Sequence, residues 1–185
     1  MPNVFQPALD RISDSQETQL KAWVHLNLHD GTLPSYEALL CDCSVEARAS
    51  NIEFSCTPGQ QDFRYRRIGA SALSQLHADY SGRYLADMPG KGPGSSIWQF
   101  VTDIATTRRP SINIAPYVGP TSNWSHVTLL GLPVADDGEA VDHVILVVDF
   151  VLWPFLKESS DVKDKTNSLR KYLFEIRERA KAGWA

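Results

Sequence analysis

Two histidines and two cysteines near the N-terminus are of a type and spacing that would suit a zinc ion. His25 and His29 stand four residues apart, which places both imidazoles on one face of a helix, and Cys41 and Cys43 follow within reach. The spacing between the two pairs is not that of a standard zinc site, and Leu26 stands where a helical metalloprotease has its general-base glutamate. We therefore interpret the histidines as surface residues and the cysteines as small, partly buried thiols, and we predict no metal site.

The usual signatures of catalysis are missing from the sequence. It contains no Gly-x-Ser-x-Gly elbow, no phosphate-binding Gly-x-x-x-x-Gly-Lys-Ser/Thr loop and no Gly-x-Gly-x-x-Gly after a strand. The loop from Gly90 to Gly94 would offer backbone amides to an anion, but its proline and the lack of a preceding parallel strand favour a simple connector. Asp136-Asp137-Gly138 has the composition of a hairpin turn rather than of an acid-base pair. We predict no catalytic residues, and we expect that the protein is not an enzyme.

Composition limits the class of protein. The chain has 185 residues, 43% of them hydrophobic, and a net charge of -4, which suits one soluble domain with a sizeable core. No apolar run approaches the roughly 20 residues that cross a bilayer, and the first residues lack the basic-then-apolar order of a secretory signal. Three cysteines, Cys41, Cys43 and Cys56, favour reduced thiols. We expect a cytoplasmic protein with no membrane span and, given its mild acidity, no nucleic-acid partner.

The hydrophobic pattern predicts an α+β chain in which two strands, helices and three strands follow one another. A helix capped by Ser13 or Ser15 ends before Asp30, and a short helix follows Ser35. We expect strands at 52–56, 63–68, 112–117, 123–132 and 141–152, with a helix over 97–105 before the last three. On a strict period of two, one face of the second strand carries Phe63, Tyr65 and Arg67, and the other carries Arg64, Arg66 and Ile68.

The segment from Asp62 to Met88 carries the most specific pattern in the chain. Its Phe-Arg-Tyr-Arg strand is followed by a glycine, a short helix and a Gly-Arg turn, and the stretch from Gly131 to Gly138 reads Gly-Leu-Pro-Val-Ala-Asp-Asp-Gly. These two linked motifs resemble the alphaproteobacterial PAS family over roughly residues 28–150. The resemblance implies the PAS fold, a five-stranded antiparallel sheet with helices on one face plus N- and C-terminal flanking helices. It divides the chain into an N-terminal helical cap (1–44), a PAS core (45–153) and a C-terminal amphipathic helix (154–185).

A PAS domain that has a ligand holds it between the inner face of the sheet and the helices that cross it. We therefore expect a largely apolar pocket, with Trp124, His126 and Thr128 together on one strand face. The candidate pocket residues are Trp98, Val101, Ile104, Tyr117, Trp124, His126 and Thr128. The alternative interpretation makes the tryptophans core residues and His126 a structural histidine.

The sequence argues against two cofactors that PAS domains bind, haem and a flavin adduct. The helix between Ser95 and Arg109 contains no histidine, cysteine or methionine, which argues against haem bound from that helix. None of the three cysteines stands in the Asn-Cys-Arg motif of the flavin photoreceptors, which argues against a flavin adduct. His77 is better explained as a solvated residue at a helix end than as a haem ligand. The identity of any cofactor is left open.

The C-terminal segment suggests how a signal would leave the domain. From Lys163 to Lys181 it carries seven basic and three acidic residues around an apolar stripe, and the candidate interface residues are Leu169, Tyr172, Leu173 and Ile176. Such a helix would dimerise, pack on the chain's own sheet or bind a partner groove, and the PAS resemblance implies a homodimer. Because no output domain accompanies the PAS core, we expect a stand-alone bacterial signalling sensor or adaptor. It would bind a small, largely apolar ligand, a signalling protein, or both; the alternative is a ligand-free dimerisation scaffold.

Overall fold

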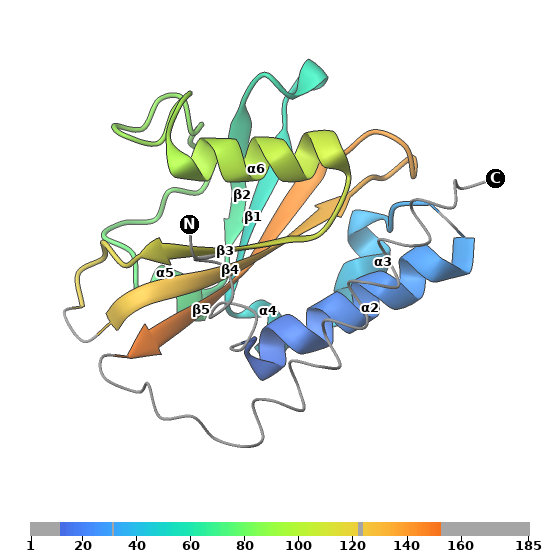
Figure 1. Ribbon diagram of the computed structural model, residues 1–185, viewed down its shortest axis with the longest axis horizontal. Coiled ribbons are helices and arrows are strands. Elements are labelled where there is room, and N and C mark those ends of the chain that lie inside the picture. The colour runs from blue at the N-terminus through green and yellow to red at the C-terminus, as the bar shows by residue number, and fades with distance from the viewer. Residues whose placement is uncertain (1–11, 31, 122–123, 153–185) are drawn as a thin grey trace, which may run out of the picture.

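The computed structural model describes residues 12–30, 32–121 and 124–152 (Figure 1). Its helices are α2 (Asp14–Asp30), α3 (Tyr36–Cys41), α4 (Val45–Arg48), α5 (Ala70–Leu73) and α6 (Ser96–Thr107), with a 3-10 turn, η1, at Pro58–Gln60. Its strands are β1 (Asn51–Cys56), β2 (Phe63–Ile68), β3 (Ser111–Pro116), β4 (Trp124–Val134) and β5 (His143–Leu152). The predicted α+β class is confirmed, and each predicted strand is present. In the described part of the chain, no helix is long and apolar enough to cross a membrane.

The strands form one antiparallel sheet in the order β2-β1-β5-β4-β3. This confirms the predicted five-stranded sheet, which is compatible with a PAS-like fold. Because β2 and β3 lie at opposite edges, the chain between them has to cross one face of the sheet. Figure 1 shows that α6 makes this crossing.

Local sequence explains why α6 begins and ends where it does. The Ser95 side chain accepts a hydrogen bond from the backbone N–H of Trp98, which is the standard N-cap interaction. At the other end Arg108 takes a left-handed conformation with φ of 56°, and Pro110 follows two residues later. Between these ends a buried stripe faces the sheet, formed by Phe100, Val101, Ile104 and Ala105.

Helices cover both faces of the sheet. Ile104 of α6 lies directly over Gly131 of β4, whereas Gln16 of α2 donates to the backbone carbonyl of Thr128 on the same strand at 3.1 Å. Residues 128 and 131 point to opposite faces because side chains alternate along a strand. The N-terminal flanking helix α2 therefore packs on the face opposite α6, together with α3 and α4 (Figure 1).

The outer edge of β2 is not open. The backbone N–H of Tyr65 donates to the carbonyl of Arg83 at 2.9 Å, and the N–H of Leu85 donates to the carbonyl of Phe63 at 2.9 Å. Gly82 starts this segment with φ of 85°, a conformation that glycine adopts without strain. The covered edge removes one of the two places where another strand would add to the sheet.

A prediction follows from the close approach of α6 to β4. A side chain at Gly131 would overlap Cδ1 of Ile104, which is fully buried. We expect Gly131→Ala to lower the free energy of unfolding by about 1–3 kcal/mol through overpacking, measured by urea denaturation. Adding Ile104→Val, which removes Cδ1, is expected to recover part of this loss.

Gly92→Ala is the matched control, because a Cβ at Gly92 would meet Ala86 at an ordinary distance of 3.4 Å. An equal loss for both glycine variants would show that the Ile104 contact is not the cause.

Candidate functional site

The space between α6 and the sheet, where the sequence placed a ligand pocket, is occupied by the chain's own side chains. Val101 and Ile104 are both fully buried, and Ile104 fills the position above Gly131 beside Leu146. Trp98 is half-buried and meets Phe63 edge-on, with ring centroids 5.3 Å apart. These residues contribute to the core, and their part in binding a ligand stays a prediction.

A β-bulge near the start of β4 separates residues that the sequence placed on one face. The register shifts between Trp124 and His126, so that Trp124 pairs with Leu152 whereas His126 pairs with Val151. Leu152 and Val151 are neighbours in β5 and point to opposite faces. The prediction that Trp124, His126 and Thr128 share a face is therefore wrong, because a bulge inserts one residue and reverses the alternation.

Tyr117 and Trp124, by contrast, do come together, around Gln75. The Tyr117 hydroxyl donates to the Gln75 backbone carbonyl at 3.0 Å, and the Trp124 indole N–H donates to the Gln75 side-chain oxygen at 2.7 Å. Both rings also contact Phe150, with centroids 5.9 and 5.7 Å away. The Tyr117 hydroxyl and the Trp124 indole N–H are thus both paired with Gln75. Through these hydrogen bonds the aromatic cluster joins the end of the sheet to the segment after α5.

Thr128 lies on the α2 face, where it helps to anchor that helix. The Gln16 side-chain amide donates to the carbonyls of Thr128 and Val147, at 3.1 and 2.9 Å, and lies 3.2 Å from the Thr128 hydroxyl. Gln16 and Thr128 are each 1% exposed. Buried polar groups are tolerated when they are paired in this way, so Thr128 has a structural role that the sequence did not reveal.

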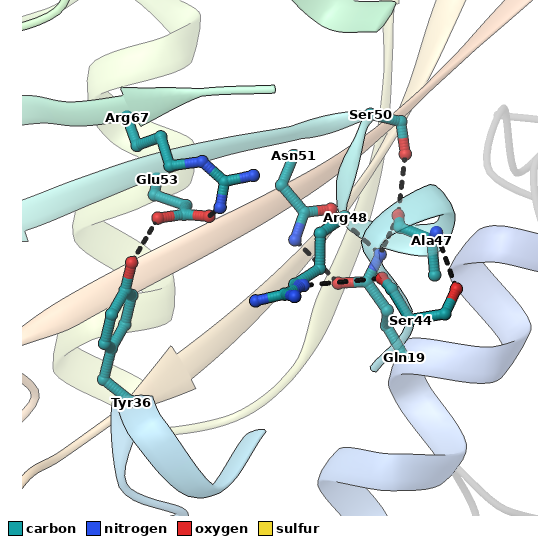
Figure 2. A network of polar contacts seen from close by, with 9 residues as sticks. All are labelled: Gln19, Tyr36, Ser44, Ala47, Arg48, Ser50, Asn51, Glu53 and Arg67. Carbon is teal, nitrogen blue, oxygen red and sulfur yellow. Dashed lines mark hydrogen bonds and ion pairs between the residues drawn. The ribbon is translucent and has the colours of Figure 1, made fainter. Parts of the chain in front are cut away.

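Polar contacts line the same face of the sheet (Figure 2), and one group of them is centred on Glu53 of β1. The Glu53 side chain is fully buried; the Tyr36 hydroxyl donates to it at 2.5 Å, and Nη1 of Arg67 lies 3.1 Å from its other oxygen. A buried carboxylate needs such partners because desolvation otherwise costs several kcal/mol. Burial is the largest cause that raises the pKa of Tyr36, and the neighbouring Glu53 carboxylate raises it further. The phenol therefore stays protonated and donates the hydrogen bond.

A second bulge explains how the arginines reach this network. Glu53 pairs with Arg67 but Phe54 pairs with Tyr65, which leaves Arg66 as the extra residue of β2. The predicted strict alternation is therefore wrong: Arg67 lies with Glu53 on the α2 face, while Ile68 is buried with Phe63 and Tyr65. The Arg66 guanidinium lies over the Tyr36 ring, 4.4 Å from its centroid.

A pair of side-chain amides ties α2 to β1 beside this network. Gln19 and Asn51 exchange two hydrogen bonds of 2.9 and 2.8 Å, and Gln19 also donates to the carbonyl of Ala47 in α4 at 2.8 Å (Figure 2). Both amides are almost completely buried. The face opposite α6 is thus held by paired polar groups, which fix one arrangement of the helices on the sheet.

A cleft of about 400 Å³ lies at the edge of this face, where the end of α2, the start of α3 and the β4–β5 hairpin meet. Asp136, Asp137 and His25 are among its lining residues. The sequence pattern predicts only a turn for the two aspartates. The cleft was not predicted, because it forms between segments about 100 positions apart in the sequence.

The remaining predicted residues are not brought into a common site. His25 and Cys41 are exposed whereas Cys43 is buried, and the part of the chain that the structure describes holds no group of three histidine, cysteine or acidic side chains suited to a metal ion. The candidate interface residues Leu169, Tyr172, Leu173 and Ile176 lie outside the described residues.

Comparisons with protein-family models, curated proteins and solved structures find no match to this chain.

The Tyr36–Glu53 hydrogen bond leads to a prediction about stability. We expect Tyr36→Phe to lower the free energy of unfolding by about 1–3 kcal/mol, because a buried carboxylate oxygen then loses its donor. Urea denaturation measures the loss. Tyr84→Phe is the control, since Tyr84 is 37% exposed and surface changes of this kind stay within about 0.5 kcal/mol.

Glu53→Gln completes a double-mutant cycle with Tyr36→Phe. A coupling energy near zero between the two positions would contradict the interaction.

The cysteines give a prediction about reactivity. Cys41 is exposed, whereas burial, with a contribution from Asp142, raises the pKa of the Cys56 thiol to about 12, and burial also raises the pKa of Cys43. Because the thiolate is the reactive form, iodoacetamide at pH 8 should alkylate Cys41 well before Cys56 and Cys43. Peptide mass spectrometry over time measures the order. Alkylation of folded Cys56 at the rate of Cys41 would contradict it, and the denatured chain provides the reference in which all three react.

Proposed function

We propose that this chain is a PAS-type sensor or adaptor of signal transduction, which acts by binding a partner protein or a second copy of itself. The observation that carries the proposal is the five-stranded antiparallel sheet crossed by α6. This is the arrangement implied by the resemblance of the strand at Phe63 and the hairpin at Gly131–Gly138. Helices cover both faces of this sheet. A partner that binds to these helices would therefore affect the packing of the core.

The packing under α6 favours a module that has no large ligand in that space. Ile104 and Val101 are fully buried there, and Ile104 occupies the position that a side chain at Gly131 would take. A ligand at the α6 face would have to displace core side chains, which costs the free energy of their burial. This packing supports the ligand-free scaffold over a sensor with its ligand under α6.

A second version of the proposal keeps a small apolar ligand at the aromatic cluster. Tyr117, Trp124 and Phe150 form a cluster of aromatic rings at that end of the sheet. Gln75 holds two of the three rings through hydrogen bonds, so a ligand would have to compete with Gln75. Native mass spectrometry of the full chain, before and after denaturation, separates the versions, because a retained small molecule adds mass only to the native peak.

The adaptor proposal predicts self-association through the C-terminal stripe. We expect light scattering to give the mass of a dimer, and we expect Leu173→Glu with Ile176→Glu to give a monomer, because each places an unpaired charge in an apolar contact. Val45→Glu is the control, since Val45 is 69% exposed in α4 and its replacement should leave the mass unchanged.

A wild-type chain that stays monomeric at high concentration would contradict the homodimer. A variant pair that stays dimeric would contradict this stripe as the interface.

A further inference from the structure

The strand β3 forms an edge of the sheet that no other described strand covers. It is last in the strand order, and among the described residues it pairs only with β4. Residues 111–116 carry no charged side chain, and their pairing with β4 has no bulge. Charges and bulges are common protections of an open edge. β3 is therefore a place where a further strand can add to this sheet.

The hydrogen bonds of β5 show which residues of β3 point away from the sheet. The N–H of Val148 donates to the carbonyl of Ser50, on the β1 side, at 3.1 Å. Successive residues of an antiparallel strand direct their backbone groups to opposite sides. Val147 therefore faces β4, where its partner is Leu130. Leu130 in turn faces β5, so the preceding residue, Leu129, faces β3.

The same alternation gives β3 two residues whose backbone groups point to the open side. Leu129 pairs with Asn113, so Asn113 directs its N–H and carbonyl toward β4. Its neighbours Ile112 and Ile114 then direct theirs away from the sheet. Pro116 is the next residue in this series, but it has no N–H to donate. The open edge thus offers two N–H donors, on Ile112 and Ile114, together with the carbonyls of the same two residues.

The sequence of this edge is symmetric about Asn113. Residues 110–116 read Pro-Ser-Ile-Asn-Ile-Ala-Pro, so an isoleucine, then a small residue, then a proline stand on each side of Asn113. An antiparallel partner with the same sequence and the same centre places Ile112 opposite Ile114 in both halves. Each donor then meets a carbonyl, and the prolines stand opposite one another at both ends, where no donor is needed. The edge is complementary to itself, as an isologous contact requires.

The side chains agree with this pairing. Ile114 pairs with Thr128 on the α2 face, and Ile112 lies on the same face two residues away; both isoleucines are half-buried. Opposite side chains on one face of an antiparallel pair contact one another. Asn113 lies on the other face, and its amide both donates and accepts, so two facing asparagines can pair. The exposed arginines at 108–109 lie at opposite ends of such a pair and do not face each other.

We propose that β3 pairs antiparallel with β3 of a second copy of this chain, about a two-fold axis at Asn113. Ile112 of each copy exchanges backbone hydrogen bonds with Ile114 of the other, and the two sheets continue into one. This inference rests on the self-association in the proposed function and adds a surface for it. The C-terminal stripe contributes to the same dimer only if it shares this axis, because a closed dimer has one two-fold axis.

Disulfide crosslinking tests the register. In the proposed pair the two Asn113 Cα atoms lie about 4.5 Å apart, a separation that a disulfide spans. Asn113→Cys in the full chain, combined with Cys41→Ser to remove the exposed thiol, should give a covalent dimer with oxidised glutathione on a non-reducing gel. Ser111→Cys in the same background is the control. Residue 111 opposes residue 115, so the two copies of residue 111 lie about 13 Å apart along the strands and should not crosslink.

A mixture of two variants checks the register again. Ser111→Cys and Ala115→Cys, combined in equal amounts, should form a covalent heterodimer, although neither variant crosslinks alone. Absence of a covalent dimer for Asn113→Cys, or equal crosslinking of Ser111→Cys alone, overturns the register, with folding of each variant confirmed by circular dichroism.

The direction of the N–H groups gives a second test. Ile114→Pro removes an N–H that points to the open side, and an edge strand tolerates proline in that position. By symmetry the dimer loses two hydrogen bonds, so its dissociation constant should rise by about tenfold or more, measured by analytical ultracentrifugation. Ile114→Val keeps the N–H and a branched side chain; it is the control and should stay within about threefold of the wild type.

The outcomes separate this inference from the proposed function. A wild-type dimer that neither crosslinks at residue 113 nor responds to Ile114→Pro overturns the β3 contact and leaves the dimer to another surface. A wild-type chain that stays monomeric at high concentration, with no crosslink at residue 113, overturns both the contact and the homodimer. If that monomer binds a Thr-Val repeat peptide at the amides of Ile112 and Ile114, seen by NMR, the occupant is a strand of another protein and not a second copy.

Discussion

The buried carboxylate of Glu53 is the constraint that fixes how β1, β2 and α3 fit together on the α2 face of the sheet. It joins three elements, because β1 carries it, β2 supplies Arg67, and α3 supplies the Tyr36 hydroxyl. A fully buried charge cannot be left unpaired without a cost of several kcal/mol. The positions of α3 and of the β2 bulge are therefore linked to one another, and a change in either one alters the environment of the same carboxylate.

This arrangement has consequences for the cleft. Tyr36 binds Glu53 through its hydroxyl, while its backbone N–H binds Asp136 in the hairpin. The same residue therefore connects the buried network to a lining carboxylate of the cleft. The packing of α3 on the sheet and the position of the hairpin are therefore linked through contiguous contacts of one residue.

The two faces of the sheet differ in the chemistry of their packing. The α6 face is closed by apolar side chains such as Ile104 and Val101, whereas the α2 face is held by the paired amides of Gln19 and Asn51 and by Gln16. Apolar packing tolerates many arrangements of similar volume, but a set of buried hydrogen bonds is satisfied in few. Hydrogen bonds therefore add a directional constraint to the packing of the α2 face, and the cleft lies at its edge.

Local patterns in the sequence were sufficient to predict α6 and the succession of strands along the chain. A serine N-cap, a stripe at helical spacing and a following proline act within about fifteen residues, so they can be recognised without knowledge of the fold. The sequence alone thus determined the α+β class and the approximate position of each strand. Tertiary structure decided the faces, because bulges at Arg66 and after Trp124 depend on which strands pair. It also decided the site: Gln16 meets Thr128 across 112 positions and Tyr36 meets Asp136 across 100, and no local period encodes contacts at that separation.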